Sequence, residues 1–350
     1  MWWWTFWQVR LVKMTELTIQ DYFPSNRCFN QPYSLEVQSL NSAKNDFLNL
    51  FEGGMTLRTR CPLCYHENTK FKQLAVKDYK GIPCYIGDCE ECGFVFSYKH
   101  LKEECLSTNY RNYSTRIRGI DISSAESREK LFLKRAGSFA QDRFNFLSEH
   151  IQGKKSVIEI GCNDGANLYP FFKNGFSVTG FDLDEDSLNV GRKFGLDLRS
   201  SDCFDFLKNE KIDVVVLSHF LEHLIDPLSF LKALQKNLNE DGHVFVEVPG
   251  IRHFQWVNWK AGVLPYMQFE HLQCFERATL VAIMEKAGFE CLKCDEFVRG
   301  VFKKSKNIKD GPIVRTEGLK YLYDVERKWN TSIKRKIYSI LVKVRDAIAK

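Results

Sequence analysis

The sequence has no long apolar segment. No stretch approaches the roughly 18 uninterrupted apolar residues that a membrane-spanning helix needs. The tryptophan-rich start, MWWWTFWQVR, is far too short, and neither a basic leader region nor a small-residue cleavage site accompanies it. We therefore expect a cytoplasmic protein whose first thirteen residues are an extension with little role; a weak membrane-surface anchor is the alternative. No internal repeat is visible, which excludes a repeat architecture.

The composition is that of a folded, mildly basic protein. Of the 350 residues, 44% are hydrophobic, so the chain can bury a real core. Its length favours two domains, or one domain with large appendages. The net charge of +6 fits a nucleic acid partner, an anionic small substrate or plain solubility. Much of the excess lies from Ile308 onward, where eleven Lys or Arg face five acids.

From Lys155 onward, short apolar runs alternate with amphipathic helical patterns. The predicted strands are 156–160, 177–182, 212–217 and 243–248, followed by two late strands within 288–302. The predicted helices are 166–174, 185–194, 227–239 and 276–287, with a further helical pattern at 130–149. This alternation predicts an α/β fold, in which a parallel sheet carries helices on both faces.

The changes of pattern predict five regions. They are a lead-in segment (1–50), a cysteine-rich domain (51–105), a helical linker (106–150), the α/β domain (151–305) and a basic helical tail (306–350). The tail pattern has no clear C-terminal stop, so it is either a docked helix or an interaction tail.

Twelve cysteines without a secretion signal indicate a metal site or free thiols. Two Cys-x-x-Cys pairs stand 24 residues apart, and they predict four ligands of one zinc ion: Cys61, Cys64, Cys89 and Cys92. Gly93 suits the tight turn after the second pair. A closed four-sulfur site leaves no open position, so this zinc is structural. The similar CLKC at 291–294 falls on a predicted strand, where we expect core residues.

The first strand of the α/β region runs into the turn IEIGCNDG, residues 158–165. A dinucleotide-binding turn has the pattern G-x-G-x-x-G, but here Asn163 holds the middle position between Gly161 and Gly165. Glu159 would repel a pyrophosphate, whereas it would accept a hydrogen bond from an ammonium group. The turn therefore favours S-adenosylmethionine over NAD.

Two further acids lie at strand ends in the expected order: Asp182 ends the strand at 177–182, and Asp202 lies near the end of a further strand expected before 212–217. Asp182 lies 21 residues after Gly161, where a carboxylate can bind both ribose hydroxyls. Asp202 is placed to meet the adenine amino group. Each of these acids could instead cap a helix. For the neighbouring Asp184, the helix cap is the interpretation that we prefer. The ordered set of Glu159, Asp182 and Asp202 favours the cofactor.

At this point the sequence resembles the class I S-adenosylmethionine-dependent methyltransferases over about residues 150–305. The segments VIEIGCNDG, VTGFDLDEDSL, DVVVLSHFLEHLIDP, VFVEVP and FEHLQCF carry the likeness. The resemblance implies a Rossmann-like, mostly parallel sheet of seven strands, here with a small N-terminal zinc-binding domain. It implies that Gly161, Asn163 and Gly165 contact the cofactor, and that His219 lines the cofactor pocket through its backbone.

A narrower resemblance, over about residues 58–290, is to the zinc-containing sugar C-methyltransferases. It rests on IGxNDG, the four cysteines, Y-x-x-Y at 110–113 and FEHLQCF at 269–275. Gln268 and Phe269 stand where that family has tyrosine and histidine, and its long C-terminal domain is absent. A sugar hydroxyl is therefore at least as compatible an acceptor as a sugar carbon.

The candidate catalytic residues are His223, Glu270, His271 and Tyr113. His223 follows the strand at 212–217 by six residues, at the edge where ligands of α/β sheets bind, and its imidazole suits a general base. Glu270 and His271 match the Glu-His pair of the sugar enzymes and could orient the acceptor or share in proton transfer. Alternatively, Glu270 caps the next helix and His271 stacks in a lid. Tyr113 could bind a sugar or diphosphate, or simply pack.

The sequence therefore predicts an S-adenosylmethionine-dependent methyltransferase of a small molecule. The most favoured acceptor is a sugar or nucleotide-sugar of cell-surface polysaccharide or deoxysugar biosynthesis. The first alternative is an RNA methyltransferase with a zinc-bearing RNA-binding module, although the Asn/Asp-Pro-Pro-aromatic loop of base-modifying enzymes reads LSHFLEH here. The second alternative is a non-catalytic zinc-containing binding protein.

Overall fold

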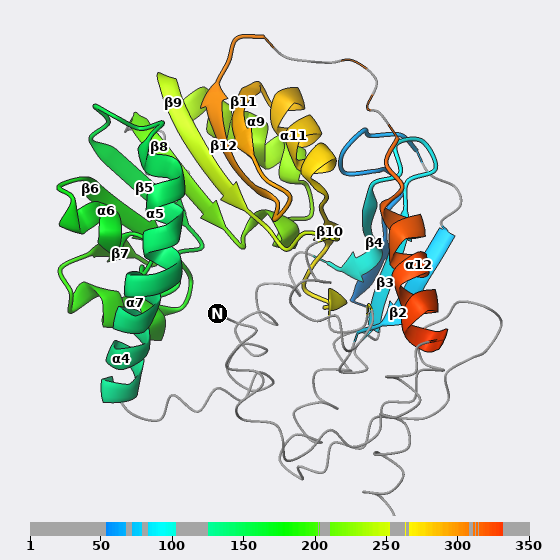
Figure 1. The fold of residues 1–350 in the computed structure, drawn as a ribbon, viewed down its shortest axis with the longest axis horizontal. Helices are drawn as coiled ribbons and strands as arrows, with labels where there is room; N and C mark the ends of the chain where they lie inside the picture. Colours follow the sequence, from blue (N-terminus) through cyan, green and yellow to red (C-terminus); the bar gives the residue numbers. More distant parts are fainter. Residues whose placement is uncertain are drawn as a thin grey trace, which may run out of the picture. The chain divides into compact units, whose positions relative to one another are not determined.

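The described residues of the chain fall into two compact units. The computed structural model describes residues 54–67, 72–78, 83–102, 125–201, 203, 211–252, 263, 266–307, 311, 313 and 315–331. Unit 1 contains those within 120–250 and 275–312, and unit 2 contains those within 2–119, 251–274 and 313–350 (Figure 1). No helix in these ranges is both long enough and apolar enough to cross a membrane.

Unit 1 is built on a seven-stranded sheet in the order β11-β12-β9-β8-β5-β6-β7 (Figure 1). The strands are β5 (Ser156–Ile160), β6 (Ser177–Phe181), β7 (Asp197–Arg199), β8 (Ile212–Ser218), β9 (Leu238–Glu247), β11 (Phe289–Cys294) and β12 (Arg299–Lys304). Strand β12 runs antiparallel to β11 and β9, and every other neighbouring pair is parallel. The predicted α/β class and the mostly parallel sheet are confirmed. The strand order reverses between β5 and β8, and such a switch point is where α/β sheets bind ligands.

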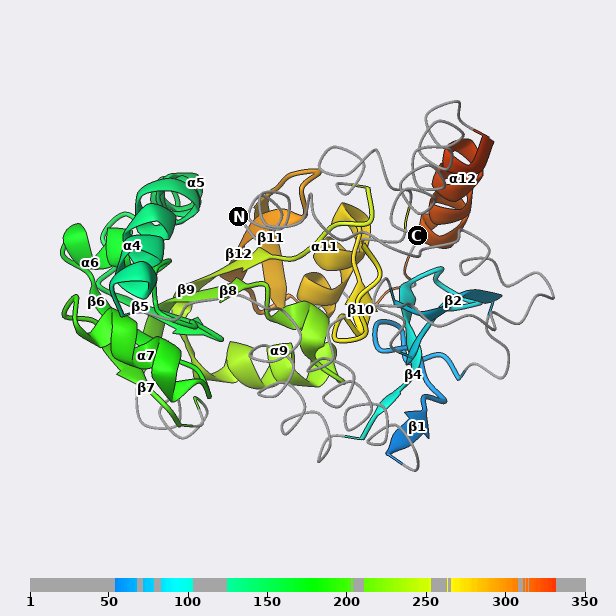
Figure 2. The same cartoon turned by 90° about the horizontal axis from the view of Figure 1, so that it is seen from below.

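Helices cover both faces of this sheet. They are α4 (Ala125–Arg135), the π-helix η2 (Ala136–Ala140), α5 (Gln141–Ser148), α6 (Tyr169–Lys173), α7 (Glu185–Arg192), the 3-10 turn η3 (Leu221–His223), α9 (Pro227–Asn237) and α11 (Arg277–Lys286). Figure 2 shows α4 and α5 on one side of the strands and α9 on the other. The helical pattern at 130–149 is confirmed, and its Phe132 and Leu147 pack in the core of unit 1.

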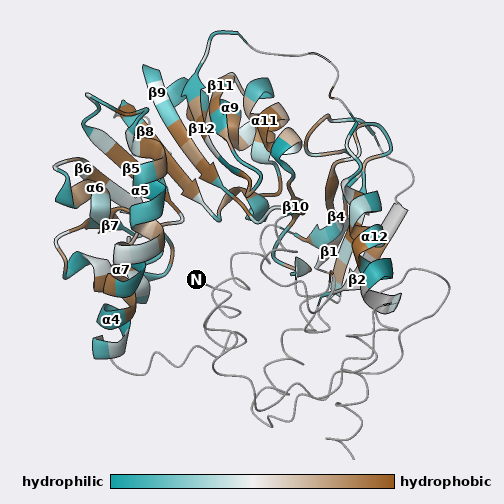
Figure 3. Ribbon diagram, in the orientation of Figure 1, coloured by the Kyte–Doolittle hydropathy of each residue, from teal (hydrophilic) through white to brown (hydrophobic). Residues whose placement is uncertain are grey.

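The predicted element boundaries hold where the apolar pattern is strongest. The central strand β8 carries the run Val214–Leu217, which is buried throughout and coloured as hydrophobic in Figure 3. Such a continuous run is typical of a strand covered on both faces. The helix predicted at 166–174 is shorter, because its first three residues complete the turn and the helix begins at Tyr169. Strand β9 is longer than predicted and begins at Leu238, directly after α9.

The prediction that Cys291 and Cys294 are core residues is wrong. Both lie on β11 at the edge of the sheet, and both are only partly buried. The register of β11 against β12 shifts between Cys291 and Lys293, which disturbs the alternation of faces expected for a regular strand.

Unit 2 contains an antiparallel sheet in the order β1-β4-β3-β2, with the short strand β10 on β4. The strands are β1 (Met55–Leu57), β2 (Lys72–Lys77), β3 (Pro83–Asp88), β4 (Val95–Leu101) and β10 (Gln273–Cys274). Helix α12 (Gly318–Thr331) buries Leu319, Leu322 and Val325 in the same core as Ile86 and Val95. The part of the tail that the structure describes is therefore a docked helix.

Candidate active site

The turn after β5 is held in a conformation that few residue types tolerate. Gly161, Asn163 and Gly165 have left-handed φ angles of 76°, 52° and 73°. Glycine adopts this region freely, and asparagine is one of the few other residues found there. A side chain at position 161 would also place its Cβ 2.8 Å from the Phe220 ring. The turn thus keeps its backbone close to the ends of β5 and β8.

A glycine on α7 lets that helix lie close to the turn. A Cβ at Gly191 would lie 2.1 Å from the carbonyl oxygen of Asp164, so only glycine lets this helix approach the turn. We expect Gly191→Ala to lower the free energy of unfolding by about 1–3 kcal/mol, because the helix or the turn must shift. Urea unfolding measures this. Gly137→Ala is the control, since a Cβ there meets nothing within 4 Å. Equal losses in the two variants would contradict the prediction.

Glu159 lies near the end of β5 and has an exposed fraction of 0%. Its Oε1 accepts a hydrogen bond from Asn167 Nδ2 at 2.6 Å, whereas Oε2 has no hydrogen-bond partner among the described residues. Burial raises the pKa of this carboxyl to about 8. A buried carboxylate with a vacant acceptor suits a cationic group brought in by a ligand.

Asp182 follows β6, the strand next to β5, and ties the two strand ends together. Its Oδ2 accepts from the backbone N–H of Asn163 at 2.8 Å and its Oδ1 from that of Asp184 at 2.9 Å. Burial raises the pKa of Asp182. Asp184 is the N-cap residue of α7, as expected, and its carboxylate accepts from Ser187 Oγ at 2.7 Å. Asp202 lies outside the described residues.

Two arginines that the sequence did not single out reach this edge of the sheet from α4 and α5. Arg135 pairs with Asp164, and Arg143 donates to both carboxylate oxygens of Glu247 at 2.7 and 3.0 Å. Arg143 also donates to Asn167 Oδ1 at 2.9 Å. A π-helix holds more residues per turn than an α-helix. The intervening η2 therefore brings both arginines to the same side.

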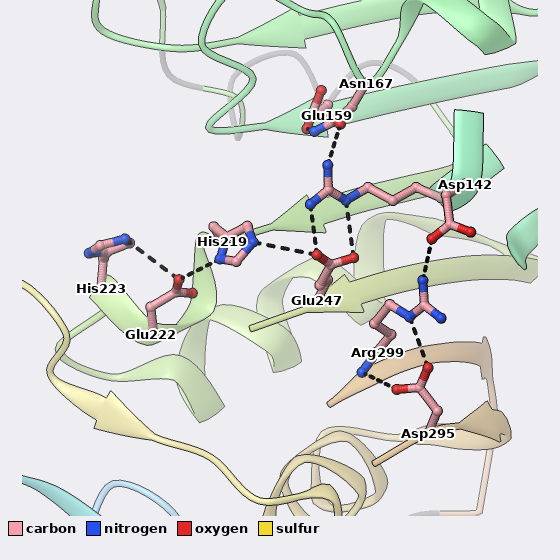
Figure 4. Close-up of polar contacts among 10 residues, drawn as sticks. Asp142, Glu159, Asn167, His219, Glu222, His223, Glu247, Asp295 and Arg299 are labelled. Atoms are coloured by element: carbon pink, nitrogen blue, oxygen red, sulfur yellow. Dashed lines mark hydrogen bonds and ion pairs between the residues drawn. The ribbon is translucent and has the colours of Figure 1, made fainter. Parts of the chain in front are cut away.

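The two histidines after β8 lie in a row with two glutamates (Figure 4). His219 Nε2 lies 3.4 Å from Glu247 Oε1, and His219 Nδ1 lies 3.4 Å from Glu222 Oε1. The same oxygen of Glu222 is 3.7 Å from His223 Nε2. Burial raises the pKa of Glu247, but Arg143 and His219 outweigh it and hold that pKa well below its usual range. Sequence reasoning found both histidines and neither glutamate.

The other candidate catalytic residues lie elsewhere in the chain. Glu270 and His271 precede β10 in unit 2, with exposed fractions of 4% and 9%. The alternative that Glu270 caps the next helix is wrong, because the N-cap residue of α11 is Glu276. Tyr113 lies outside the described residues. Of the sequence-predicted residues, unit 1 therefore brings together Glu159, Asp182 and the two histidines.

The two Cys-x-x-Cys pairs of unit 2 form turns with the same hydrogen-bond scheme. The first cysteine of each pair donates its N–H to the carbonyl five residues later, and it accepts from the N–H four residues later. The bonds are Cys61 to His66 and Tyr65 to Cys61, and Cys89 to Phe94 and Gly93 to Cys89. The residues at the matching positions, Tyr65 and Gly93, both have left-handed φ angles, 60° and 71°. The glycine was predicted, but the tyrosine was not.

The four sulfurs fit a zinc ion. Cys61 Sγ lies 3.7 Å from Cys92 Sγ, and Cys64 Sγ lies 3.6 Å from Cys89 Sγ. All four lie within 4.8 Å of one another. A tetrahedron with Zn–S bonds of about 2.3 Å has edges of about 3.8 Å, so the sulfurs already stand at ligand separation. No described cysteine forms a disulfide.

A segment far along the chain clamps the second cysteine turn. Thr316 N donates to Cys92 O at 2.9 Å, and the guanidinium of Arg315 donates to the carbonyls of Cys89, Glu90 and Glu91. A Cβ at Gly93 would meet the Thr316 carbonyl oxygen at 2.0 Å. The clamp consequently needs glycine at that position for a second reason besides its φ angle.

Comparison with known proteins finds relatives of the α/β region that forms unit 1. The chain resembles the ubiquinone biosynthesis O-methyltransferase of Actinobacillus pleuropneumoniae serotype 7 (strain AP76), with 32% identity over 117 residues, 29% of this chain and 50% of that protein. It also resembles the enzyme of the same name from Idiomarina loihiensis, with 26% identity over 42% of this chain and 68% of that protein. The chain spans about half the length of several of the curated relatives that it matches.

Solved structures are similar too. A S-adenosylmethionine-dependent methyltransferase from Thermotoga maritima, described as a possible histamine N-methyltransferase, aligns with a TM-score of 0.40 and 17% identity, over 51% of this chain and 93% of that one. One from Archaeoglobus fulgidus aligns with a TM-score of 0.37 and 22% identity, over 55% and 87%. Residues 132–293 match the family model described as a methyltransferase domain. These residues are therefore similar to a methyltransferase domain.

Proposed function

We propose that this chain is a S-adenosylmethionine-dependent methyltransferase that acts on an oxygen of a small molecule, and that the acceptor is a sugar or a nucleotide-sugar. The observation that carries the proposal is the buried carboxylate of Glu159, whose Oε2 has no hydrogen-bond partner among the described residues, beside a glycine turn at the switch point of the sheet. A carboxylate in that position suits the ammonium group of a bound amino acid moiety.

Each residue of the edge has a defined part in this proposal. Glu159 accepts from the cofactor ammonium group, and Asp182 accepts from the ribose hydroxyls. Gly161 keeps the space between the turn and Phe220 narrow, which helps to exclude water. The sulfonium supplies an activated methyl group. His223 takes the proton of the acceptor hydroxyl while the new O–C bond forms and the C–S bond breaks, which leaves a neutral thioether.

The four cysteines of unit 2 are proposed to hold a structural zinc ion. Four thiolates complete a tetrahedral zinc site, so no position is open for a substrate or a water molecule. The metal then contributes to folding and takes no part in methyl transfer. Glu270 and His271, with Tyr113, are proposed to orient the acceptor.

The relatives that are named O-methyltransferases favour an oxygen acceptor. The four cysteines and the FEHLQCF segment, which resemble those of the sugar C-methyltransferases, favour a sugar. The purified, zinc-loaded protein should transfer a labelled methyl group from S-adenosylmethionine into a nucleotide-sugar pool. Label in an unmodified RNA pool would overturn the sugar acceptor. The non-catalytic alternative predicts no transfer to either pool and no binding of S-adenosylhomocysteine.

Replacement of the base should separate catalysis from binding. We expect His223→Ala to lower the rate of methyl transfer by about 10²- to 10⁴-fold, because no imidazole is then present to take the proton of the substrate hydroxyl. The dissociation constant of S-adenosylhomocysteine, measured calorimetrically, should change less than about twofold. His150→Ala, which removes a histidine of unit 1 that follows α5, is the control. A full rate in His223→Ala would rule out this base.

A further inference from the structure

Charged and polar side chains follow one another along the carboxyl edge of the sheet in unit 1. The contacts run from His223 to Glu222, His219, Glu247, Arg143, Asn167 and Glu159 (Figure 4). These residues come from β5, β9, α5, the turn before α6 and the segment after β8. One continuous polar chain therefore joins the candidate base to the candidate acceptor of the cofactor ammonium.

His219 is the central member of this chain, and both of its ring nitrogens face a carboxylate. Nδ1 lies 3.4 Å from Glu222 and Nε2 lies 3.4 Å from Glu247. Ionised carboxylates only accept hydrogen bonds, so an imidazole that interacts favourably with both needs a proton on each nitrogen. The backbone of His219 is itself constrained: its φ is 55°, and its N–H donates to the carbonyl of Glu247 at 2.8 Å. Left-handed backbone of this kind persists only when its surroundings hold it there.

Glu222 is the member whose burial needs an explanation. Its exposed fraction is 1%, and neither carboxylate oxygen has a hydrogen-bond partner by geometry among the described residues. A carboxylate this deeply buried is costly unless a cation lies beside it. Two ring nitrogens of unit 1 lie beside it: Nδ1 of His219 is 3.4 Å from Oε1, and Nε2 of His223 is 3.7 Å from the same oxygen. Because Glu222 and His223 share the short turn η3, the carboxylate and the imidazole are held at a fixed separation.

We propose that Glu222 is a positioning residue, which holds His219 as an imidazolium and orients the imidazole of His223 through the same oxygen. His219 is then a charged tie between the ends of β8 and β9, with no nitrogen left to accept a proton. The proton acceptor at this edge is His223. The catalytic meaning of this inference rests on the proposed function, whereas the charge state of His219 does not.

The electrostatics of the edge agree with this assignment. Partial desolvation lowers the pKa of His219, but the contacts with Glu222 and Glu247 outweigh it and raise that pKa to about 9. The charged groups that face the imidazole are Glu222 on its own segment and Glu247 at the end of β9, and Arg143 of α5 pairs with Glu247. Removing either carboxylate should therefore lower the pKa of His219.

The test is a histidine titration of the full chain by ¹⁵N NMR. The protein is labelled at its histidines, and the His219 signals are assigned by their loss in His219→Gln. In the wild type we expect both ring nitrogens to be protonated at pH 8, with a midpoint of about 9. Glu222→Gln should lower the midpoint by about one to two pH units. Glu247→Gln gives a second, independent reading from the other nitrogen, should Glu222→Gln fail to fold.

The control variant is Glu240→Gln, which removes an exposed glutamate that pairs with Lys304 in the same unit. It should leave the midpoint of His219 unchanged. A wild-type midpoint near the ordinary histidine value of 6.5, or an unchanged midpoint in both Glu222→Gln and Glu247→Gln, would overturn the inference.

Calorimetry with S-adenosylhomocysteine on the same samples separates this inference from the proposed function. Glu222→Gln should still bind it, because His219, Glu247, Arg143 and Asn167 stand between Glu222 and Glu159 in the chain of contacts. If the wild type does not bind it at all, the proposed function fails while the titration of His219 stands. If binding is normal but His219 titrates near 6.5, only the inference fails.

Discussion

Cys89→Ser should leave unit 2 without metal and unfolded around its two cysteine turns. Binding of a structural zinc ion contributes about 10–16 kcal/mol in small zinc domains, which is as much as the whole stability of a typical domain. The two turns have no disulfide, and in the described chain the cysteines of one turn meet those of the other through sulfur. Metal content by mass spectrometry and far-ultraviolet circular dichroism on heating measure both effects.

The control for this experiment is Cys291→Ser. Cys291 is a partly buried cysteine on β11 of unit 1, so its replacement should change neither the zinc content nor the unfolding of unit 2. A chelator added to the wild type should reproduce the loss seen with Cys89→Ser. One zinc ion per chain and an unchanged melting curve in Cys89→Ser would exclude the four-sulfur site.

Glu159→Gln should weaken the binding of S-adenosylmethionine by about 100-fold or more, because an ionised partner of a buried ammonium group is lost. In the wild type the carboxyl has a pKa of about 8, so below that pH most of it is protonated. Binding of the ammonium group must expel this proton. The affinity should therefore rise by roughly tenfold per pH unit between pH 6 and 7.5. This range lies below the pKa of about 7.7–8.0 that is typical of an α-amino group, so the ligand keeps its ammonium charge. Calorimetry in two buffers of different ionisation enthalpy measures the released proton.

The same carboxyl should make the ligand-free protein less stable as the pH rises. Its pKa in the folded state is raised from 4.5 to about 8, so between these values the folded state holds a proton that the unfolded state has lost. The free energy of unfolding then falls with increasing pH, by about 3 kcal/mol from pH 5 to pH 8. Urea unfolding of wild type and Glu159→Gln at both pH values should show this dependence in the wild type alone. Equal pH dependence in the two proteins would assign it to other groups.

The elements of unit 1 were predictable because each carries its own local signal. The buried run of β8 and the turn from Gly161 to Gly165 can be read within a dozen residues. Arg143 and Glu247 give no such signal, because they meet across 104 residues and each would suit an exposed helix or a strand end equally well. Tyr65 was missed for another reason: its left-handed φ is imposed by the cysteine turn and not by its own preference.

Arg315 and Thr316 show the same limit in unit 2. The sequence predicts a basic tail there, but nothing in it indicates that Arg315 reaches the carbonyl of a residue 226 positions earlier. The cysteine spacing itself was sufficient to predict that the four sulfurs lie together, because the geometry of a four-sulfur ligand set restricts that spacing tightly. Local chemistry was thus predictable, and the partners supplied by distant segments were not.

The clamp on the second cysteine turn also has a consequence for how the chain folds while it is being synthesised. A ribosome finishes both cysteine turns by residue 92, but Arg315 and Thr316 follow more than 220 residues later. The strands β5, β6, β7, β8 and β9 of unit 1 come from one uninterrupted stretch, so they can pair while the chain is still growing. The second cysteine turn must wait for a segment made more than 220 residues later, and the nascent chain carries an unclamped set of thiols throughout that interval.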